Sequence, residues 1–452
     1  GTRRSFMKPM NRREFFSRTG KVAAAASAGV FSINALGANE KIIAASMGML
    51  GRGRYLGEWF AQRDDVELAY ICDVDSRIFK DRSKLIEDTQ GKAPKCVQNI
   101  KEVLDDKDVD VIINATPDHW HALGTIWACQ AGKDVYVEKP TSHNIWESRK
   151  MVEAARKYGR IVQVGAQNRS APYCHKAFDY IRSEAFGSVH FARVINSKER
   201  GAIGKKPDGE PPAGVDYDMW LGPAPNRPFN PNRFHYNWHW FWDFSGGDII
   251  NDGVHQMDIA RWLIDKDYPK FVTSGGGKIF FDDDQECPDT HSVIYDFDGL
   301  TMVFEEVLWA PYMRKTPMEI RDLDTLPNWP FSGTRIEIYG SKQFMMLGRH
   351  GGGWEVFDAD GKSVNVTHGE FTDANHGHIG NFIDCVRSRE LPNADIEKVH
   401  LSTLLCHYGN IAYRTGRRLQ IDPATEGFVN DDDANSYVKR TYREPYVVPE
   451  QV

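Results

Sequence analysis

Two glycines and one carboxylate have the types and the spacing of a dinucleotide-binding site. Gly51 and Gly53 follow an apolar run over residues 41–49, and glycines at a strand end let the backbone turn tightly and approach a pyrophosphate. A helix that starts there stabilises the phosphate charge through its free N–H groups and its dipole. Asp73 lies 20 residues after Gly53, at the end of a second apolar run. A carboxylate there accepts hydrogen bonds from ribose hydroxyls and repels the 2'-phosphate of NADP, so these residues predict NAD binding.

The glycine pattern is incomplete on its own. The third glycine of a Gly-x-Gly-x-x-Gly motif falls on Leu56, and Gly57 comes one position late. Gly51, Arg52 and Gly53 are the expected cofactor residues of this turn, and the alternative is a bare glycine turn that binds no phosphate. The position of Asp73 favours the dinucleotide.

A second candidate site is the aromatic run RFHYNWHWFW over residues 233–242. Aromatic faces next to amide and imidazole groups suit the faces and hydroxyls of a sugar ring, so we expect His239 and Trp240 to contact a substrate. The alternative is a core or a subunit interface, where aromatic residues are also enriched. His235 and His239 have an i, i+4 spacing that metal sites use, but no glutamate completes a His-Glu-x-x-His arrangement. No metal is predicted.

The cofactor residues need strands to position them, and the first part of the chain supplies these. Residues 55–63 have helical spacing, and the strand-like apolar runs are 41–49, 66–72, 109–115, 135–138 and 161–165. Strands that alternate with helices favour a doubly wound parallel sheet, in which ligands bind beyond the carboxyl ends of the strands. We therefore expect a Rossmann dinucleotide-binding domain over residues 41–165.

The sequence changes character after residue 166. Runs such as 292–297 and 301–305 alternate like antiparallel strands that have one solvated or partner-facing side. Residues 376–387 and 395–414 have amphipathic helical spacing and should return to the first domain. We expect residues 166–452 to form an α/β substrate and oligomerisation domain on a large, open, mostly antiparallel sheet.

Composition and charge exclude several classes of function. The 452 residues are 41% hydrophobic, which is enough for one large core or two ordinary ones. The net charge of -7 gives no concentrated positive field, so nucleic acid is not an expected partner. The seven cysteines are scattered without a Cys-x-x-Cys pair, which argues against a disulfide framework or a zinc knuckle. After the first forty residues no apolar run reaches the ~18 residues of a membrane-spanning helix. We expect a small-molecule ligand.

Four further motifs are shared with one enzyme family. They are Glu138-Lys139-Pro140 preceded by Thr116-Pro117-x-x-x-His121, residues 165–169 (GAQNR), residues 246–258 (GGDIINDGVHQMD) and residues 378–384 (HIGNFID). On these motifs the chain resembles the Gfo/Idh/MocA family of NAD(P)-dependent oxidoreductases over nearly all of its length after residue 41. The resemblance implies a Rossmann domain, an α/β domain whose open sheet often packs against a second subunit in a dimer or tetramer, and a substrate pocket between the domains.

The resemblance also implies roles for individual residues. Lys139 would lie near the nicotinamide and hydrogen-bond the reacting hydroxyl, and the alternative is a surface lysine in a turn. Arg169 falls in a shared motif and would contact the substrate. His255 would be the general base, and the alternative is a structural histidine that bonds only to backbone. The other residues that the shared motifs assign to the cofactor site are Thr116, Pro117, His121 and Glu138.

One position departs from the family pattern. The family places an acid four residues before the histidine, whereas this chain has Asn251 there and an acid at Asp252. Both residues stand within one helical turn of His255, so either could orient its imidazole or contact the substrate. An asparagine cannot take up a proton, which leaves the assignment of the acid open between them.

Three functions are compatible with these residues. The first is an NAD-dependent oxidoreductase that moves hydride between nicotinamide and a secondary alcohol or ketone of a sugar or glycoside. The second is a redox-neutral glycoside hydrolase or lyase that oxidises the sugar transiently with bound NAD. The third is a non-catalytic ligand-binding protein on the same fold, and Lys139 speaks against it.

The first forty residues resemble an export signal. Arg3-Arg4 and Arg12-Arg13 each resemble a twin-arginine motif, and a weakly apolar, alanine-rich stretch follows over residues 22–36. The alternative is a basic, disordered arm with a short helix. We expect cleavage near Ala38 and a periplasmic or otherwise exported protein, which the twin-arginine route would carry already folded.

Overall fold

Six short apolar strands pair to form the first sheet of the computed structural model, which describes residues 40–452. The strands are β1 (Ile42–Met47), β2 (Val66–Cys72), β3 (Lys95–Val97), β4 (Val111–Asn114), β5 (Asp134–Val137) and β6 (Val162–Val164). Their order is β3-β2-β1-β4-β5-β6, and every pair is parallel. β4 and β5 are buried at every residue, as parallel strands covered on both faces must be. The order reverses between β1 and β4, which is the place where such sheets bind ligands.

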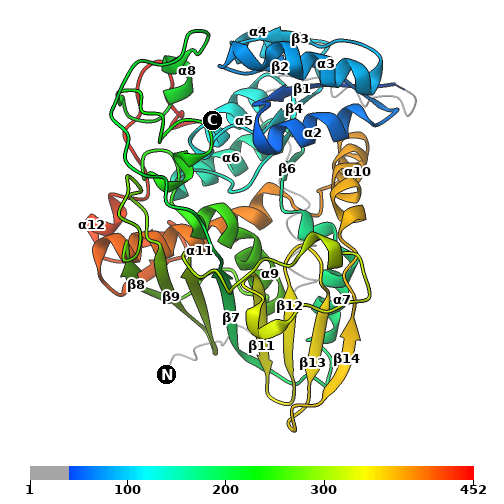
Figure 1. Ribbon diagram of the computed structural model, residues 1–452, viewed down its shortest axis with the longest axis vertical. Coiled ribbons are helices and arrows are strands. Elements are labelled where there is room, and N and C mark those ends of the chain that lie inside the picture. The colour runs from blue at the N-terminus through cyan, green and yellow to red at the C-terminus, as the bar shows by residue number, and fades with distance from the viewer. Residues whose placement is uncertain (1–39) are drawn as a thin grey trace, which may run out of the picture. The chain divides into compact units, whose positions relative to one another are not determined.

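Helices connect these strands and pack on the sheet (Figure 1). They are α2 (Gly51–Ala61), α3 (Phe79–Gln90), α4 (Ile100–Leu104), α5 (Asp118–Gln130) and α6 (Ile145–Lys157). α2 begins without a side-chain cap and without an acidic residue in its first turn. Its N-terminal N–H groups are therefore not taken by a side chain, as a phosphate-binding helix requires. The predicted Rossmann fold is confirmed.

The second sheet has ten strands. They are β7 (Val189–Ser197), β8 (Phe271–Gly277), β9 (Thr290–Phe297), β10 (Leu300–Val307), β11 (Arg335–Gly340), β12 (Phe344–Gly348), β13 (Trp354–Phe357), β14 (Ser363–Thr367), β15 (Leu419–Asp422) and β16 (Gly427–Phe428). Their order is β14-β13-β12-β11-β7-β10-β9-β8-β15-β16, and only the β7–β10 pair is parallel. Residues of β10 alternate between buried and partly exposed. The predicted large, open, mostly antiparallel sheet with one covered face is thus confirmed.

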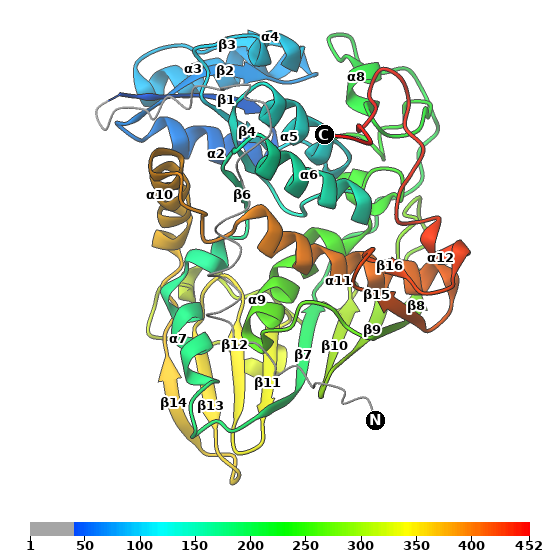
Figure 2. The same cartoon turned by 180° about the vertical axis from the view of Figure 1, so that it is seen from behind.

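The covered face of this sheet packs against helices. The helices after β6 are α7 (Pro172–Tyr180), α8 (Tyr217–Leu221), α9 (Val254–Ile264), α10 (Thr372–Ser388), α11 (Ile396–Thr415) and α12 (Asp432–Asn435). Both views show α9 and α11 between the two sheets (Figures 1 and 2). α11 contacts α6 and β6 of the first sheet as well as β8 and α9. These contacts place the C-terminal helix α11 against the first domain.

The export signal predicted over residues 1–40 lies, except for residue 40, outside the described part of the chain. Among the helices of residues 40–452, none has the length and apolarity that crossing a bilayer demands.

Candidate active site

The cofactor turn after β1 is built on three glycines with different tasks. Gly48 ends the strand with φ +87°, and a Cβ there would stand 2.6 Å from the carbonyl oxygen of Ala115. A Cβ on Gly53 would stand 2.1 Å from the carbonyl oxygen of Gly48, so Gly53 lets α2 approach the strand. Gly51 has φ +47° and open space around its missing Cβ, which fits the place where a pyrophosphate approaches the backbone.

This geometry corrects the expected alignment of the glycine motif. Gly51 and Gly53 were expected to be its first two glycines, with the third position at Leu56. In the structure Gly48 makes the tight turn, and Gly53 fills the role of the third glycine in packing the helix on the strand. Gly48 was not predicted as a motif glycine because it lies within the apolar run 41–49.

Asp73 lies where the ribose prediction requires, at the end of β2. Its Oδ2 accepts from the backbone N–H of Met49 at 2.9 Å, and its Oδ1 accepts from that of Asp75 at 3.0 Å. These bonds hold the carboxylate beside the glycine turn, on the wall of the cavity. Burial raises the pKa of Asp73 to about 6, and the two backbone hydrogen bonds oppose that shift. The donors and acceptors of this turn therefore fit an NAD dinucleotide.

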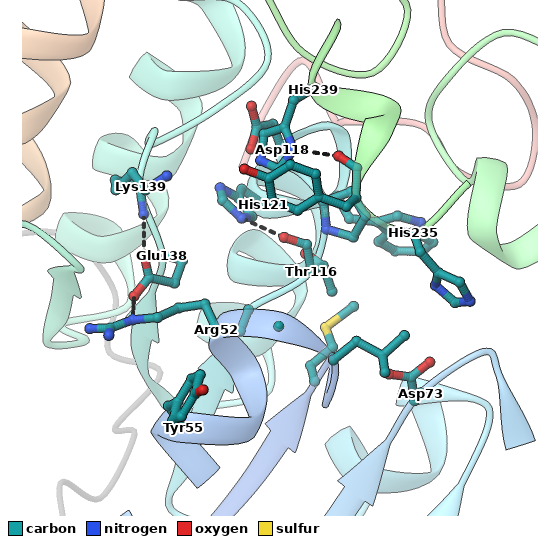
Figure 3. Close-up of a pocket in the computed structure, with 18 of the residues that line it drawn as sticks. Arg52, Tyr55, Asp73, Thr116, Asp118, His121, Glu138, Lys139, His235 and His239 are labelled. Carbon is teal, nitrogen blue, oxygen red and sulfur yellow. Dashed lines mark hydrogen bonds and ion pairs between the residues drawn. The ribbon is translucent and has the colours of Figure 1, made fainter. Parts of the chain in front are cut away.

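Lys139 connects the cofactor half of the cavity to α9. Its Nζ donates to the backbone oxygen of Asn251 at 2.7 Å and to Oδ1 of the same residue at 3.3 Å. Glu138 is buried, accepts from Nε of Arg52 at 3.1 Å and accepts from the backbone N–H of Lys139 at 3.2 Å. Figure 3 shows Glu138 between Lys139 and Arg52. Lys139 therefore lines the cavity and bonds to Asn251, which argues against a solvated lysine in a surface turn.

His121 fixes the two segments that lead to Lys139. Its Nδ1 lies 2.7 Å from the carbonyl oxygen of Pro140, and its Nε2 lies 2.9 Å from that of Thr116. Burial lowers the pKa of His121 to about 4, so the ring is neutral at ordinary pH. Thr116, Pro117 and His121 all line the cavity as expected, and the contacts of His121 make it a positioning residue.

Asn251 and Asp252 lie in the π-helical segment Ile249–Gly253 that precedes α9. Four cationic side chains surround the Asp252 carboxylate, at 2.5 Å (Lys315), 3.0 Å (Arg200), 3.1 Å (Lys198) and 3.1 Å (Arg349). Burial raises the pKa of Asp252, but these cations outweigh burial and hold it well below its usual range. Asp252 therefore stays ionised and cannot exchange a proton at neutral pH.

His255 lies on the cavity wall, in the first turn of α9. Its Nδ1 is buried and has no hydrogen-bond partner among the described residues. The expectation that Asn251 or Asp252 orients the imidazole is therefore wrong for this structure, because Asn251 bonds to Lys139 and Asp252 to its four cations. Burial, with Arg349 and Lys139 nearby, lowers the pKa of His255 well below its ordinary value. The neutral ring can accept a proton only from a group that enters the cavity.

Two expected substrate residues lie elsewhere. Arg169 binds Asp258 through Nε at 2.8 Å and Nη2 at 2.7 Å inside the core, and it does not line the cavity. Trp240 is buried in an aromatic cluster with Trp220 and Phe244. Both predictions are corrected because long-range packing, which the local pattern does not encode, turns these side chains away from the site.

The rest of the aromatic run does reach the cavity. Tyr236, Trp238 and His239 line it, and the rings of Trp238 and His239 stack with centroids 3.6 Å apart. Nδ1 of His239 lies 2.6 Å from the Tyr236 carbonyl oxygen, and burial lowers the pKa of His239 to about 3. No cluster of three or more histidine, cysteine or acidic side chains in residues 40–452 could hold a metal ion.

Sequence reasoning missed several residues of the site. Asp118 begins α5 and accepts a hydrogen bond from Ser245, and burial raises its pKa to about 7. His350 follows β12, and its ring contacts that of His255 with centroids 4.5 Å apart. The glycine run after His350 signals an unusual turn, but no local pattern predicts that this turn meets α9. Other missed lining residues are Met318, Arg321, Phe371, Asn375 and His376.

One cavity of about 1280 Å³ joins these groups. Its lining runs from the glycine turn and Asp73 past Glu138 and Lys139 to Asn251, His255 and His350. Figure 3 shows Asp73 and Lys139 at opposite sides of the view, with Thr116 and His121 between them. An extended cofactor and a small polar ligand could therefore occupy adjoining parts of the same space.

Curated relatives match the chain in part. Inositol 2-dehydrogenase of Salmonella typhimurium is 24% identical over 205 residues, which is 45% of this chain and 48% of that protein. The scyllo-inositol 2-dehydrogenase (NAD(+)) of Bacillus subtilis is 29% identical over 178 residues, which is 39% of this chain and 41% of that protein. The chain spans about half the length of the first of these curated relatives.

Solved structures share the fold over most of the chain. WlbA dehydrogenase from Bordetella pertussis, in complex with NADH and UDP-GlcNAcA, superposes with a TM-score of 0.61 at 19% identity, covering 85% of this chain and 99% of that one. Levoglucosan dehydrogenase in complex with NADH and levoglucosan gives a TM-score of 0.64 at 14% identity, covering 84% and 99%.

Two sequence models of one family match most of the chain. The oxidoreductase family, NAD-binding Rossmann fold (GFO_IDH_MocA), matches residues 45–166. The oxidoreductase family, C-terminal alpha/beta domain (GFO_IDH_MocA_C2), matches residues 202–298 and 337–448. With its glycine turn, Asp73 and Lys139 at one cavity, the chain belongs to the Gfo/Idh/MocA oxidoreductase family.

Proposed function

We propose that the protein is an NAD-dependent oxidoreductase that moves hydride between nicotinamide and a secondary alcohol or ketone of a sugar or glycoside. The observation that carries the proposal is the single cavity in which the dinucleotide turn and Asp73 adjoin Lys139, Asn251 and His255. The inositol and levoglucosan dehydrogenases among its relatives support a cyclic polyol as the substrate class.

Lys139 and His255 have different roles at the substrate hydroxyl. NAD, when bound, supplies the hydride acceptor. The Lys139 ammonium lies on the cavity wall with Nζ oriented by Asn251, so it can donate to the oxygen of the reacting hydroxyl or of the resulting ketone. His255 is neutral and unpartnered at Nδ1, so it can accept the hydroxyl proton. Asp252 is excluded from this proton transfer because its cations keep it ionised.

The experiment is a measurement of NADH formation by the purified protein with NAD and a panel of cyclic polyols. The panel contains myo-inositol, levoglucosan and methyl glucosides, and products are identified by NMR. We expect one NADH for each ketone formed, and Lys139→Met serves as the inactive control. Consumption of a glycoside without net NADH would support the redox-neutral alternative. No reaction with any member would contradict the proposal.

We further infer that the protein is exported and forms a homo-oligomer. The paired arginines and the alanine-rich stretch of residues 1–40 support a twin-arginine signal. Exposed apolar side chains on the ten-stranded sheet, Ile294, Tyr339, Val364 and Val366, support a dimer or tetramer through that sheet. Fractionation of cells and light scattering of the purified protein test these two points, and a cytoplasmic monomer would contradict both.

A further inference from the structure

His350 is held in a strained turn beside the proposed base. Its φ is +53°, and Gly351, Gly352 and Gly353 follow with φ of +90°, +77° and +65°. A left-handed backbone is unfavourable for histidine, and such residues cluster at functional sites. The left-handed turn between β12 and β13 thus places the His350 ring beside His255.

Contacts from three sides fix the position of this ring. The backbone N–H of His350 donates to Oδ1 of Asn168 at 3.1 Å, and its ring stacks on Phe371 with centroids 4.8 Å apart. The preceding residue, Arg349, donates to the backbone oxygen of Asp252 at 3.2 Å. The imidazoles of His350 and His255 meet edge to face at 72°. His350 is therefore fixed relative to the start of α9.

Both imidazoles of this pair present a nitrogen that has no partner. Nε2 of His350 and Nδ1 of His255 are buried without a hydrogen bond to any described residue. Leaving a buried polar atom unpaired is unfavourable. Both residues line the cavity, so a ligand group that reaches these nitrogens would pair with them. Burial and Arg349 lower the pKa of both rings, so each is neutral and offers one donor and one acceptor.

We propose that His350 is a specificity-determining residue that binds the hydroxyl next to the one that reacts at Lys139 and His255. The substrate is then a ring that carries a vicinal diol, and this inference rests on the function proposed above. A hydroxyl both donates and accepts, so it suits a neutral imidazole. A charged group suits it less, because the nearby Arg349 is already bound to Asp252.

Two variants separate the ring nitrogen from the turn that carries it. His350→Asn tolerates the left-handed backbone but is too short to reach the position of Nε2. His350→Gln places an amide near that position. The matched control is His407→Asn in α11, because His407 is also buried with an unpartnered Nε2 but does not line the cavity.

The measurement is kcat and KM for the best polyol of the panel and for each of its mono-deoxy analogues. We expect the wild type to discriminate against one analogue by about 10- to 100-fold in kcat/KM. His350→Asn should lose that discrimination, mainly by raising KM for the parent polyol. His350→Gln should restore part of it, and His407→Asn should keep all of it.

The outcomes distinguish this proposal from the one on which it rests. Equal losses on the parent and on every analogue, or unchanged discrimination, would show that His350 is only structural and would overturn the assignment. In either of these cases, hydride transfer from a polyol to NAD by the wild type would still support the proposed function. No hydride transfer from any polyol to NAD would overturn both.

Discussion

The Asp252→Asn substitution removes the one carboxylate that four cations share. Lys198 and Arg349 are almost fully buried, with side-chain exposures of 4% and 3%, whereas Arg200 is 17% and Lys315 38% exposed. Asp248 would remain as the ionised partner of Lys198 and Arg200. Glu306 would not compensate, because burial and Asp248 raise its pKa and keep it neutral. The variant therefore leaves an excess of buried positive charge.

The expected loss of stability follows from this burial. Removing one partner of a buried ion pair costs about 3–5 kcal/mol, because the other charge stays buried and unpaired. The contact with Lys315 adds only about 0–1 kcal/mol, since solvent screens it. Lys315 also has its pKa lowered to about 8 by burial and by the other cations, so it can release its proton and relieve part of the repulsion. We expect a net loss of about 3–5 kcal/mol, mostly from Arg349, because Lys198 and Arg200 keep Asp248 as a partner.

Urea unfolding at several pH values checks this magnitude. The folded-state pKa of Asp252 is depressed, so its contribution is present above the unfolded pKa near ~4 and is lost only as pH falls through the folded value. The difference between wild type and variant should be constant above about pH 5 while Lys315 stays protonated, and it should shrink as pH rises toward about 8 and Lys315 releases its proton. Asp433→Asn is the control, because its pair with Arg417 is exposed and its loss should leave the stability nearly unchanged. If Asp252→Asn has wild-type stability and a shifted pH–rate profile, the four ion pairs do not hold Asp252 ionised, and Asp252 would be the proton acceptor.

Three further predictions concern the cofactor and the reacting hydroxyl. Lys139→Met should retain NAD affinity in a titration but lose ~10²-fold or more in turnover, and normal turnover would make the lysine structural. The preference for NAD over NADP should shrink between pH 7.5 and 5.5 as Asp73, with its pKa raised to about 6, loses its charge. In Asp73→Asn the preference for NAD should change less with pH, because only the 2'-phosphate of NADP still titrates there. A pH-independent preference in the wild type would contradict the role of Asp73. Gly53→Ala should weaken NAD binding ~10-fold or more, because its Cβ would collide with the Gly48 carbonyl. Gly57→Ala should bind NAD normally, since its Cβ meets the flexible end of Met49 and makes an ordinary contact with Leu68, and equal effects would contradict the revised glycine motif.

Five of the six strands of the first sheet could be predicted because they are local apolar runs, whereas the short β3, which begins with a lysine, was missed. β2 was predicted at its observed bounds, and β4 and β5 were predicted to within two residues. Parallel strands are buried on both faces, so hydrophobicity alone marks them. Asp73 could be predicted with them, because it follows the carboxyl end of such a strand and the sheet brings those ends to one edge, whereas the role of Lys139 came from the family resemblance.

The other half of the site depends on contacts between distant segments. Trp238 and Trp240 are two residues apart in one aromatic run, yet the first lines the cavity and the second is core. Arg169 lies in a family motif but pairs with Asp258, which is 89 residues away. His350 meets His255 only because the β12–β13 turn packs against α9. The sequence gives the polar or aromatic type of each of these residues, but tertiary packing determines which of them line the cavity.

The departure from the family pattern at Asn251 has a physical reason in this packing. Its side chain donates through Nδ2 to Oδ1 of Asp248 at 3.0 Å and accepts from Nζ of Lys139 at 3.3 Å. A carboxylate at this position could accept from Lys139, but it could not donate to Asp248 and would place two like charges within contact. Asp248 is already committed to Lys198 and Arg200, so its ionised state is fixed. An amide at position 251 can therefore donate to the ionised Asp248 and accept from Lys139 at the same time. Asn251 cannot take up the hydroxyl proton itself, which leaves His255 as the acceptor in the proposed reaction.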